Sequence, residues 1–351
     1  MSDAFVNDVK QVYLNGEYRI LTALARQVIA GVGSDNWLQL KEAEVHVFNQ
    51  YLLNESELIR QEYTKLLPEL REAYFTEAQN TFSEISKFKN LRRGINAIRN
   101  DTVLGLSPVS TLMEKATNTL ESTIFRMIRA AEDAYRTVIY RASADSMVGD
   151  ITRRQAARNA LQGFAEQGIT GFVDKAGRNW ELGSYVEMSM RATIRQTETQ
   201  ARVNSMVAEG MNLFIVSVHA ENCQLCNPWE NQVLCIKAEE GYPTVSEAIS
   251  QGLFHPNCKH TLNVYFKGIT RPAKPLYDKE TNAKRYEFTQ KQRYNERQIR
   301  KYKRLESVSA GKDKEKYKAK VKQWQSHNAQ FVKENDLTRD RKREQIKTMV
   351  R

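Results

Sequence analysis

The sequence predicts an α+β protein that is predominantly α-helical, with a helical N-terminal body, a small zinc-knuckle-like α+β module and a basic helical-hairpin tail. Three observations lead to this prediction. Apolar residues recur every three or four positions through most of the chain, which is typical of helices with one buried side. Between residues 213 and 266 this period is replaced by short β-type runs around a stretch rich in Cys and His. Positive charge is concentrated in the residues that follow.

We place the three regions at residues 1–211, 212–268 and 269–351. A chain of 351 residues can form two or three compact units at roughly 150 residues each. Hydrophobic residues make up 41% and charged residues 27%, a globular composition. No apolar run approaches the ~20 residues that span a bilayer, and the N-terminal residues lack a signal-peptide layout. Four cysteines fit a protein made in a reducing cytoplasm better than a secreted disulfide scaffold.

The body is predicted to begin with an amphipathic helix over residues 2–30. A second helical pattern runs from residue 37 to about residue 82, and Pro68 should interrupt it because proline lacks a backbone donor and clashes with the preceding turn. The clearest buried stripe starts near Pro108, with Ser107 as a helix cap.

The end of the body contains a change of pattern. A helix over residues 152–167 should stop at Gly168, and a short β-hairpin is expected over residues 169–182. Ser184 and Glu187 have capping-box spacing and predict the start of a helix that runs to Gly210.

The middle module is predicted from two strand patterns. Residues 213–219 are short, apolar and rich in β-branched side chains, and residues 261–266 have a similar character. A short helix is expected over residues 245–251. The Cys- and His-rich stretch lies between the two strands.

Metal-type side chains are concentrated from His219 to His260. Two cysteines two residues apart are followed by a His-x-x-Cys with the same gap, which is the spacing of a tetrahedral zinc site built from two turns. Zinc takes thiolates and neutral imidazoles at ~2.0–2.3 Å. We therefore predict a structural zinc ion. The candidate ligands are Cys223, Cys226, Cys258, His255, His260 and His219.

Six candidates for four positions leave the ligand set open. The simplest set is Cys223, Cys226, His255 and Cys258, but His260 could replace His255 and His219 lies close enough in sequence to compete. The remaining cysteine, Cys235, is expected in the core. The alternative is that these residues hold tight turns without a metal.

A catalytic metal would need an open coordination position and a nearby carboxylate base. The acidic residues of this stretch have no recognised catalytic spacing, and the chain contains no phosphate-binding Gly-rich loop. The sequence therefore favours a non-enzymatic role. The alternative is a metal-dependent enzyme, nuclease-like or transferase-like, that acts on nucleic acid through the Cys/His module.

The tail carries the positive charge of the protein. From Lys267 to Arg351 there are 26 Lys and Arg against 11 Asp and Glu, whereas the preceding 266 residues have 27 basic and 31 acidic side chains. Helices are predicted over residues 279–305 and 312–335, and aromatic residues recur at intervals that favour a helical hairpin with a thin apolar seam. The charge asymmetry predicts a polyanion or an acidic protein surface as partner.

A nucleic acid would be bound through its phosphates, because neutralised phosphates release counterions. The tail residues that we assign to this contact are Arg293, Arg297, Arg300, Lys303, Arg304, Lys318 and Lys322. The alternative is a solvated helical surface on which glutamates at helical spacing balance the lysines.

Three motifs together resemble a known family. They are His219-Ala-x-x-Cys-x-x-Cys-x-Pro-Trp-Glu-Asn-Gln-Val233, then Gly252-Leu-Phe-His-Pro-Asn-Cys-Lys-His260, and then Tyr286-x-Phe-x-Gln-Lys-Gln-Arg-Tyr-x-Glu-Arg-x-Ile-Arg-x-x-Lys-Arg304. Their order and spacing are similar to those of the minor capsid protein 2 family of tailed bacteriophages, which is related to phage head-morphogenesis proteins. The similarity covers roughly residues 130–350.

The resemblance implies a virion component, present in few copies in an oligomeric setting at the capsid interior or portal vertex, after synthesis in the bacterial host cytoplasm. Its expected partners are the portal protein, the major capsid protein and packaged DNA, and its expected roles are head assembly and DNA packaging or ejection. Many members have His or Arg where this chain has Cys223 and Cys226. The resemblance alone therefore does not imply the zinc ion.

Overall fold

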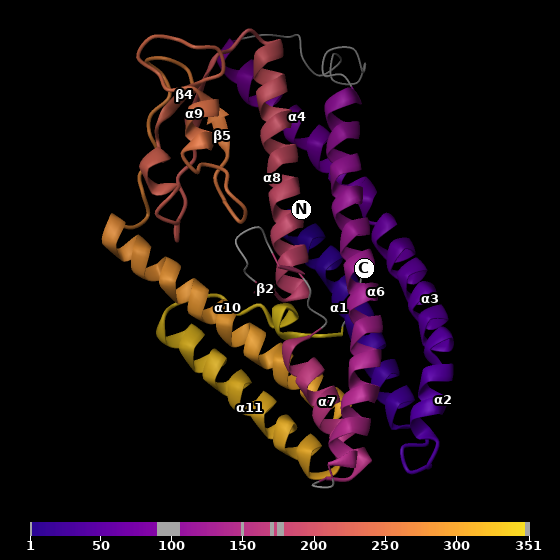
Figure 1. Cartoon of the computed structure of the whole chain (residues 1–351). Coiled ribbons are helices and arrows are strands. Elements are labelled where there is room, and N and C mark those ends of the chain that lie inside the picture. Colours follow the sequence, from indigo (N-terminus) through magenta and orange to yellow (C-terminus); the bar gives the residue numbers. More distant parts are fainter. Residues whose placement is uncertain (1, 90–105, 149–150, 169–171, 174–178, 348–351) are drawn as a thin grey trace. The chain divides into compact units, whose positions relative to one another are not determined.

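The computed structural model describes residues 2–89, 106–148, 151–168, 172–173 and 179–347, and these are mostly helical (Figure 1). The predominantly α-helical α+β class is confirmed. The long helices are α1 (Ser2–Ile29), α3 (Val45–Thr64), α4 (Leu67–Lys89), α6 (Leu106–Met147), α7 (Arg153–Gln167), α8 (Leu182–Ala208), α10 (Lys279–Val308) and α11 (Gly311–Glu334). The short helices are α2 (Trp37–Ala43), α9 (Val245–Ser250) and the 3₁₀ turns η1 (Asn227–Trp229) and η2 (Arg341–Glu344).

Local signals placed most helix ends. The Thr152 hydroxyl accepts a hydrogen bond from the Gln155 backbone N–H, and α7 ends just before Gly168, whose φ of 79° suits glycine. The predicted capping box at Ser184 was wrong, because α8 already begins at Leu182. The Ser184 hydroxyl instead donates to the Glu181 carboxylate at 3.2 Å.

The long helical pattern after residue 37 is divided more often than predicted. α3 ends at Thr64 and α4 begins at Leu67, so the expected break falls just before Pro68. A further break at Glu44 separates α2 from α3 and carries no Gly or Pro signal.

Strands β3 (Leu213–Val216), β4 (Val233–Cys235) and β5 (Leu262–Val264) form an antiparallel sheet with β3 in the centre. Phe214 pairs with Leu234 on one side and with Val264 on the other. The sequence predicted β3 and β5 but missed β4, because three residues carry no measurable period. The predicted hairpin is present as β1 (Phe172–Val173) and β2 (Asn179–Trp180), and its turn lies outside the described residues.

The chain folds into two compact units, each built from three separate segments. The first unit contains residues 1–6, 66–118 and 188–290, and the second contains residues 7–65, 119–187 and 291–351. These boundaries differ from 211 and 268, so the division into three consecutive regions stays a prediction.

The core of the first unit is formed by the sheet and the helices that cover it. Phe214, Leu234 and Leu262 are fully buried, and they pack with Met206 of α8 and Ile85 of α4. The same apolar cluster includes Cys226 and Cys258. Two of the candidate ligands are therefore fixed by the core itself.

The core of the second unit contains large aromatic side chains. The Tyr13 hydroxyl donates to the Leu120 carbonyl at 2.8 Å, and the rings of Phe48 and Tyr135 stack with centroids 4.7 Å apart. The predicted seam of the tail hairpin is present, since Tyr294 meets Trp324 edge-on at 5.9 Å. Such aromatic pairs typically add about 0.5–1.5 kcal/mol beyond their burial.

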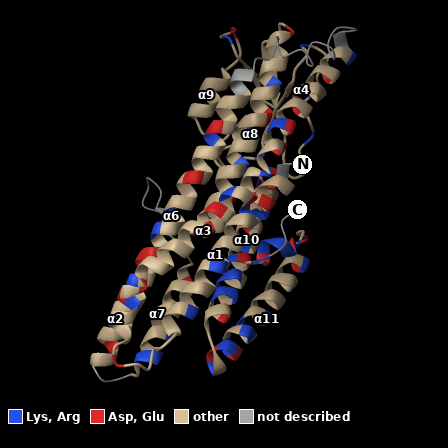
Figure 2. Cartoon of the chain, turned by 90° about the vertical axis from the view of Figure 1, so that its right-hand side faces the viewer, with Lys and Arg blue, Asp and Glu red and all other residues tan. Residues whose placement is uncertain are grey.

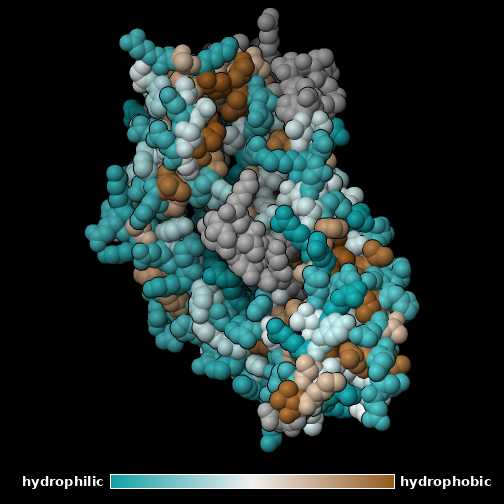
Figure 3. Space-filling model, in the orientation of Figure 1, coloured by the Kyte–Doolittle hydropathy of each residue, from teal (hydrophilic) through white to brown (hydrophobic). Residues whose placement is uncertain are grey.

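The surface seen in the space-filling view is mainly hydrophilic, with apolar residues in small separate groups (Figure 3). Among the described residues, no helix combines the length and apolarity needed to cross a bilayer.

Candidate metal centre

The first loop of the site is the turn from Cys223 to Cys226, which follows β3. The backbone N–H groups of Cys226 and Asn227 both donate to the Cys223 carbonyl, at 3.2 and 3.1 Å. This tight turn directs the two sulfurs to the same side. Glu221, just before it, has a φ of 61°, which lets the chain reverse as it enters the turn.

The second loop runs from α9 to β5 and repeats this construction. The Cys258 backbone N–H donates to the His255 carbonyl at 2.9 Å. Phe254 and Asn257 lie at φ values of 58° and 71°. Asn tolerates this left-handed conformation better than most residues, whereas Phe does not. The His-x-x-Cys spacing thus forms a turn that is the counterpart of the first.

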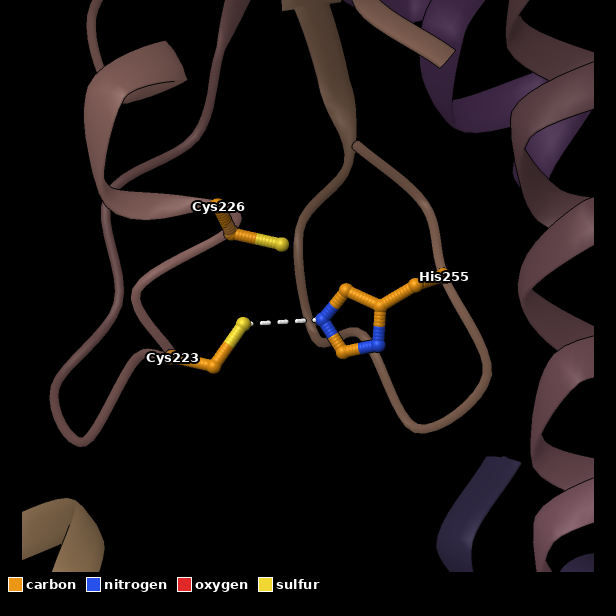
Figure 4. A group of neighbouring side chains, drawn as sticks. All are labelled: Cys223, Cys226 and His255. Atoms are coloured by element: carbon orange, nitrogen blue, oxygen red, sulfur yellow. Dashed lines mark hydrogen bonds between the residues drawn. The ribbon is translucent and has the colours of Figure 1, made fainter. Parts of the chain in front are cut away.

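The two loops bring their sulfur and nitrogen atoms together. Cys223 Sγ lies 2.8 Å from His255 Nε2, and the Cys226 sulfur points into the same space (Figure 4). Cys226 Sγ lies 3.5 Å from Cys258 Sγ, which in turn lies 3.5 Å from His260 Nδ1. These atoms fall into two groups that could hold a metal ion, Cys223–Cys226–His255 and Cys226–Cys258–His260.

The chemistry of this donor set fits zinc. Bond lengths of ~2.3 Å to sulfur and ~2.0–2.1 Å to nitrogen place tetrahedral S···S neighbours at ~3.8 Å and S···N neighbours at ~3.6 Å. The two distances around Cys258 are close to these values, whereas Cys223 and His255 would have to separate by about 0.7 Å. Cys226 belongs to both groups, so it is the common member of any ligand set.

Both histidines present one nitrogen to the sulfurs because the other nitrogen is already bonded. His255 Nδ1 donates to the Pro256 carbonyl at 2.7 Å, which leaves Nε2 as the free acceptor. His260 Nε2 donates to Glu230 Oε1 at 2.9 Å, which leaves Nδ1 facing Cys258. A carboxylate behind a histidine is the usual way in which proteins orient a metal-binding imidazole.

The electrostatics of the site favour a charged sulfur at Cys258. The hydrogen bond between Cys226 and Cys258 raises the pKa of Cys226 and lowers the pKa of Cys258. Burial opposes the charged form of His260, but its hydrogen bonds to Cys258 and Glu230 outweigh burial and raise its pKa. Metal ligation requires the thiolate, and the lowered pKa of Cys258 favours that form.

His219 lies beside the site without joining either group. Its Nε2 is hydrogen bonded to the Ser217 hydroxyl at 2.9 Å, and its backbone N–H donates to Glu230 Oε1 at 2.8 Å. The ring meets that of His260 edge-on, with centroids 5.1 Å apart. Burial lowers the pKa of His219. The structure therefore places five of the six predicted ligands in the two groups and leaves His219 outside both.

Glu230 is the residue that sequence reasoning missed as part of this site. In the sequence it is one of the acidic residues that have no catalytic spacing, whereas in the structure its Oε1 accepts from both the His260 ring and the His219 backbone. Its position four residues after Cys226 carries no ligand-type signal. Cys235 is buried away from the two groups, and its thiol donates to the Tyr242 carbonyl at 3.4 Å, in agreement with its predicted core position.

Two of the predicted nucleic-acid contacts are buried. Arg300 and Arg304 are 2% and 3% exposed, and both bind the Glu181 carboxylate, at 2.5 and 2.8 Å. Their charge is balanced inside the second unit, so neither side chain is offered to a phosphate in this structure. The sequence identified these arginines as basic, but the carboxylate that pairs with them lies more than 100 residues away.

The other predicted contacts differ in accessibility. Arg293 is half-buried, and Lys303 donates to the Gln345 side chain at 2.6 Å. Arg297 is exposed beside the Tyr294 ring, with its guanidinium carbon 6.0 Å from the ring centroid. Lys318 and Lys322 of α11 are exposed.

Comparison with known proteins adds family evidence. The sequence matches the family described as phage minor capsid protein 2 over residues 2–333. The match extends further towards the N-terminus than the motifs indicated.

Two similar relatives are both named structural protein. The one from Lactococcus phage LL-H is 27% identical over 225 residues, which is 60% of this chain and 61% of the relative. The one from Lactococcus phage mv4 is 34% identical over 113 residues, which is 30% of this chain and 92% of the relative. The match thus spans less than two thirds of the length of the first relative. No solved structure shows significant similarity to the chain.

Proposed function

This chain belongs to the phage minor capsid protein 2 family, and on that premise we propose that it associates with the portal inside the head and acts in head assembly and in DNA packaging or ejection. A phage structural protein fits a place in the virion. The portal vertex as its site, and contact with the major capsid protein and DNA, are parts of the proposal.

The observation that carries a structural role is the way the Cys/His centre is built. Its donors come from two loops separated by about thirty residues, and Cys226, Cys258 and His260 are buried. Glu230 accepts a hydrogen bond from His260, which is how a carboxylate orients a metal-binding imidazole. We propose that a zinc ion held by Cys223, Cys226, Cys258 and one of the two histidines joins the loops.

Zinc in this position would stabilise the fold. Binding energy of a structural metal is folding energy, because the unfolded chain has no preformed site. The expected content is one zinc per chain by elemental analysis. Cys223→Ser should lose the metal and unfold at lower temperature, whereas Cys235→Ser should keep one zinc. Equal zinc content in both variants would contradict this ligand set.

Association with the portal is tested by co-purification. The protein and the portal protein of the same phage are co-expressed, and the complex is isolated through a tag on the portal. We expect a fixed stoichiometry with few copies of this chain per portal ring. Absence of the chain from purified portal, with the chain itself folded, would contradict the proposed location.

The enzyme alternative has a specific test. The Cys/His module could act as a metal-dependent nuclease, in which case DNA would be cleaved in the presence of zinc or magnesium and His260→Ala would abolish cleavage. We expect no cleavage above background. Cleavage that the His260→Ala variant lacks would replace the structural assignment by an enzymatic one.

The basic tail is the part that we propose to face DNA. Its charge exceeds what solubility requires, with 26 basic against 11 acidic residues. Some of this charge is used inside the protein, because Arg300, Arg304 and Arg343 all pair with carboxylates. The outward surface of the tail must therefore supply the contact.

A further inference from the structure

The two helices of the tail use their positive charge differently. Arg300 and Arg304 of α10 are enclosed by ion pairs, whereas α11 carries a lysine at every second position from Lys312 to Lys322. Figure 2 shows Lys and Arg recurring along both helices. Because a helix turns about 100° per residue, this alternation separates the six lysines of α11 into two rows.

The first row contains Lys314, Lys318 and Lys322, and the second contains Lys312, Lys316 and Lys320. Around the helix axis, the first row lies on average about 60° from the buried residue Val321, and the second row lies about 140° from it in the other direction. In the first row all three lysines are exposed, and within the described part of the chain none of them has a hydrogen-bond or ion-pair partner.

The second row is partly engaged. The Lys316 ammonium lies over the Tyr317 ring, 5.3 Å from its centroid, and Lys320 donates to the Gln323 side chain at 3.0 Å. These contacts hold two of the three side chains against the helix. The first row is thus the row of α11 in which all three lysines remain available to a partner.

We propose that Lys314, Lys318 and Lys322 form a contact for the phosphate backbone of duplex DNA, which refines the DNA-facing role proposed for the tail and rests on it. Successive lysines of the row are about 6 Å apart along the helix axis. This is close to twice the ~3.4 Å rise per phosphate of one DNA strand, so neighbouring lysines reach alternate phosphates. Lysines act as point charges on flexible stems, which favours contact without sequence preference.

An acidic protein surface is the competing partner. It would present carboxylates with a geometry fixed by its own fold, and such pairs favour the planar fork of arginine over lysine. An evenly spaced row of lysines without accompanying exposed arginines on α11 suits a regular polyanion better. Duplex DNA is therefore the partner to which the row is assigned.

The test uses the full chain and a random-sequence duplex of about 20 base pairs, with binding followed by fluorescence anisotropy across salt concentrations. The variant K314Q/K318Q/K322Q removes the first row. The variant K312Q/K316Q/K320Q removes the second row and is the matched control, with the same helix, the same number of charges and the same net charge. Circular dichroism and thermal unfolding establish that both fold.

Each neutralised phosphate contributes about −0.9 to the slope of log affinity against log salt, so loss of three contacts should reduce the slope by about 2.7. Between 50 and 200 mM salt, wild type should lose about 40-fold more affinity than the first-row variant. The control variant should retain a slope close to that of wild type.

Three results overturn the inference. Equal loss in both variants means that only net charge matters, and a wild-type slope in the first-row variant means that the row touches no phosphate. If the first-row variant still binds DNA like wild type but no longer associates with the portal, the row contacts an acidic protein surface instead. If wild type itself does not bind the duplex, the DNA-facing role of the tail fails, which is distinct from failure of the row alone.

Discussion

Glu181 shows what a single carboxylate contributes to the second unit. It lies between the guanidinium groups of Arg300 and Arg304, and Arg300 also donates to the Arg343 carbonyl at 2.6 Å. Burial alone would raise the pKa of Glu181, but the two arginines outweigh burial and hold the pKa far below 4.5. The carboxylate therefore stays charged wherever the protein is folded at ordinary pH.

Replacing Glu181 by Gln should destabilise the protein by about 3 kcal/mol at pH 7, because two buried arginines lose their counter-charge. Urea unfolding measures this difference. The control is Glu166→Gln, which breaks the half-exposed pair between Lys301 and Glu166 and should cost less than about 1 kcal/mol. Similar losses of unfolding free energy in the two variants would show that the buried ion pairs of Glu181 contribute no more to stability than the partly exposed pair of Glu166.

The same replacement predicts a pH dependence. A carboxyl with a lowered folded pKa stabilises the protein above its unfolded pKa of about 4.5, and that stability is lost as pH falls towards the folded pKa. The difference between wild type and Glu181→Gln should therefore be constant near neutral pH and narrow below about pH 4.5. Stability measured between pH 3 and 7 checks this, and a difference that widens on acidification would contradict the assignment.

In the proposed metal centre, Glu230 would act through His260, whose ring it holds by a hydrogen bond. Removal of such an orienting partner typically weakens metal affinity by about 10–100-fold. We expect this loss for Glu230→Ala in a zinc competition assay with a chromophoric chelator, and partial recovery for Glu230→Gln, which keeps an acceptor oxygen. The exposed residue Glu240 provides the control. In a His260→Ala background, Glu230→Ala should have little further effect, and additive losses would mean that Glu230 acts by another route.

At the scale of elements, the first loop of the metal centre is tied to the start of α10. Asn282 donates to the Asn222 side chain at 2.5 Å, and the Glu221 backbone N–H donates to Asn282. The Arg285 guanidinium pairs with the Glu221 carboxylate at 3.2 Å. Cys223 directly follows Glu221 and Asn222 in the sequence. The loop that would bind zinc therefore also anchors the first turns of α10.

Zinc removal should therefore loosen the start of α10. After chelation we expect faster amide hydrogen exchange over residues 280–290, with unchanged exchange in α11. Asn282→Ala should produce the same loosening with zinc still bound. Lys284→Ala on the same helix is the control, since its ammonium pairs with Glu280 and both side chains are exposed. Unchanged protection of residues 280–290 in the chelated protein would show that the loop and the helix are independent.

The whole molecule consists of two units, and each contains a different group of side chains that we expect to stabilise it. The Cys/His centre belongs to the first unit, and the Glu181 ion pairs belong to the second. The chain passes from one unit to the other five times, yet each unit has its own buried core. We therefore expect that stability can be perturbed in one unit at a time.

Calorimetry should resolve this division. We expect two thermal transitions, one for each unit. Chelation should lower the melting temperature of the first unit and leave the second unchanged. Glu181→Gln should lower the melting temperature of the second unit by about 6–12 °C, at ~2–4 °C per kcal/mol, and leave the first unchanged. The chelated Glu181→Gln protein should show both shifts. A single transition that moves under either perturbation would mean that the two units unfold as one.

The sequence by itself determined what depends on neighbouring residues. Most helical periods, the Gly168 stop and the two turns of the Cys/His centre are local, and they were predicted where the structure has them. The family was also accessible from short motifs in order. Strand β4 and the break at Glu44 were missed because neither carries a local signal strong enough to compete with its surroundings.

Only the tertiary structure decided which charges are used inside the protein. Arg300 and Lys318 look alike in sequence as basic residues of a basic tail, but Arg300 meets a carboxylate 119 residues away and Lys318 faces solvent. The same holds for Glu230, which became part of the metal centre when folding brought His260 to it across 30 residues. Charge is a property of the residue, whereas desolvation and pairing are properties of the packed environment, and distant segments create that environment.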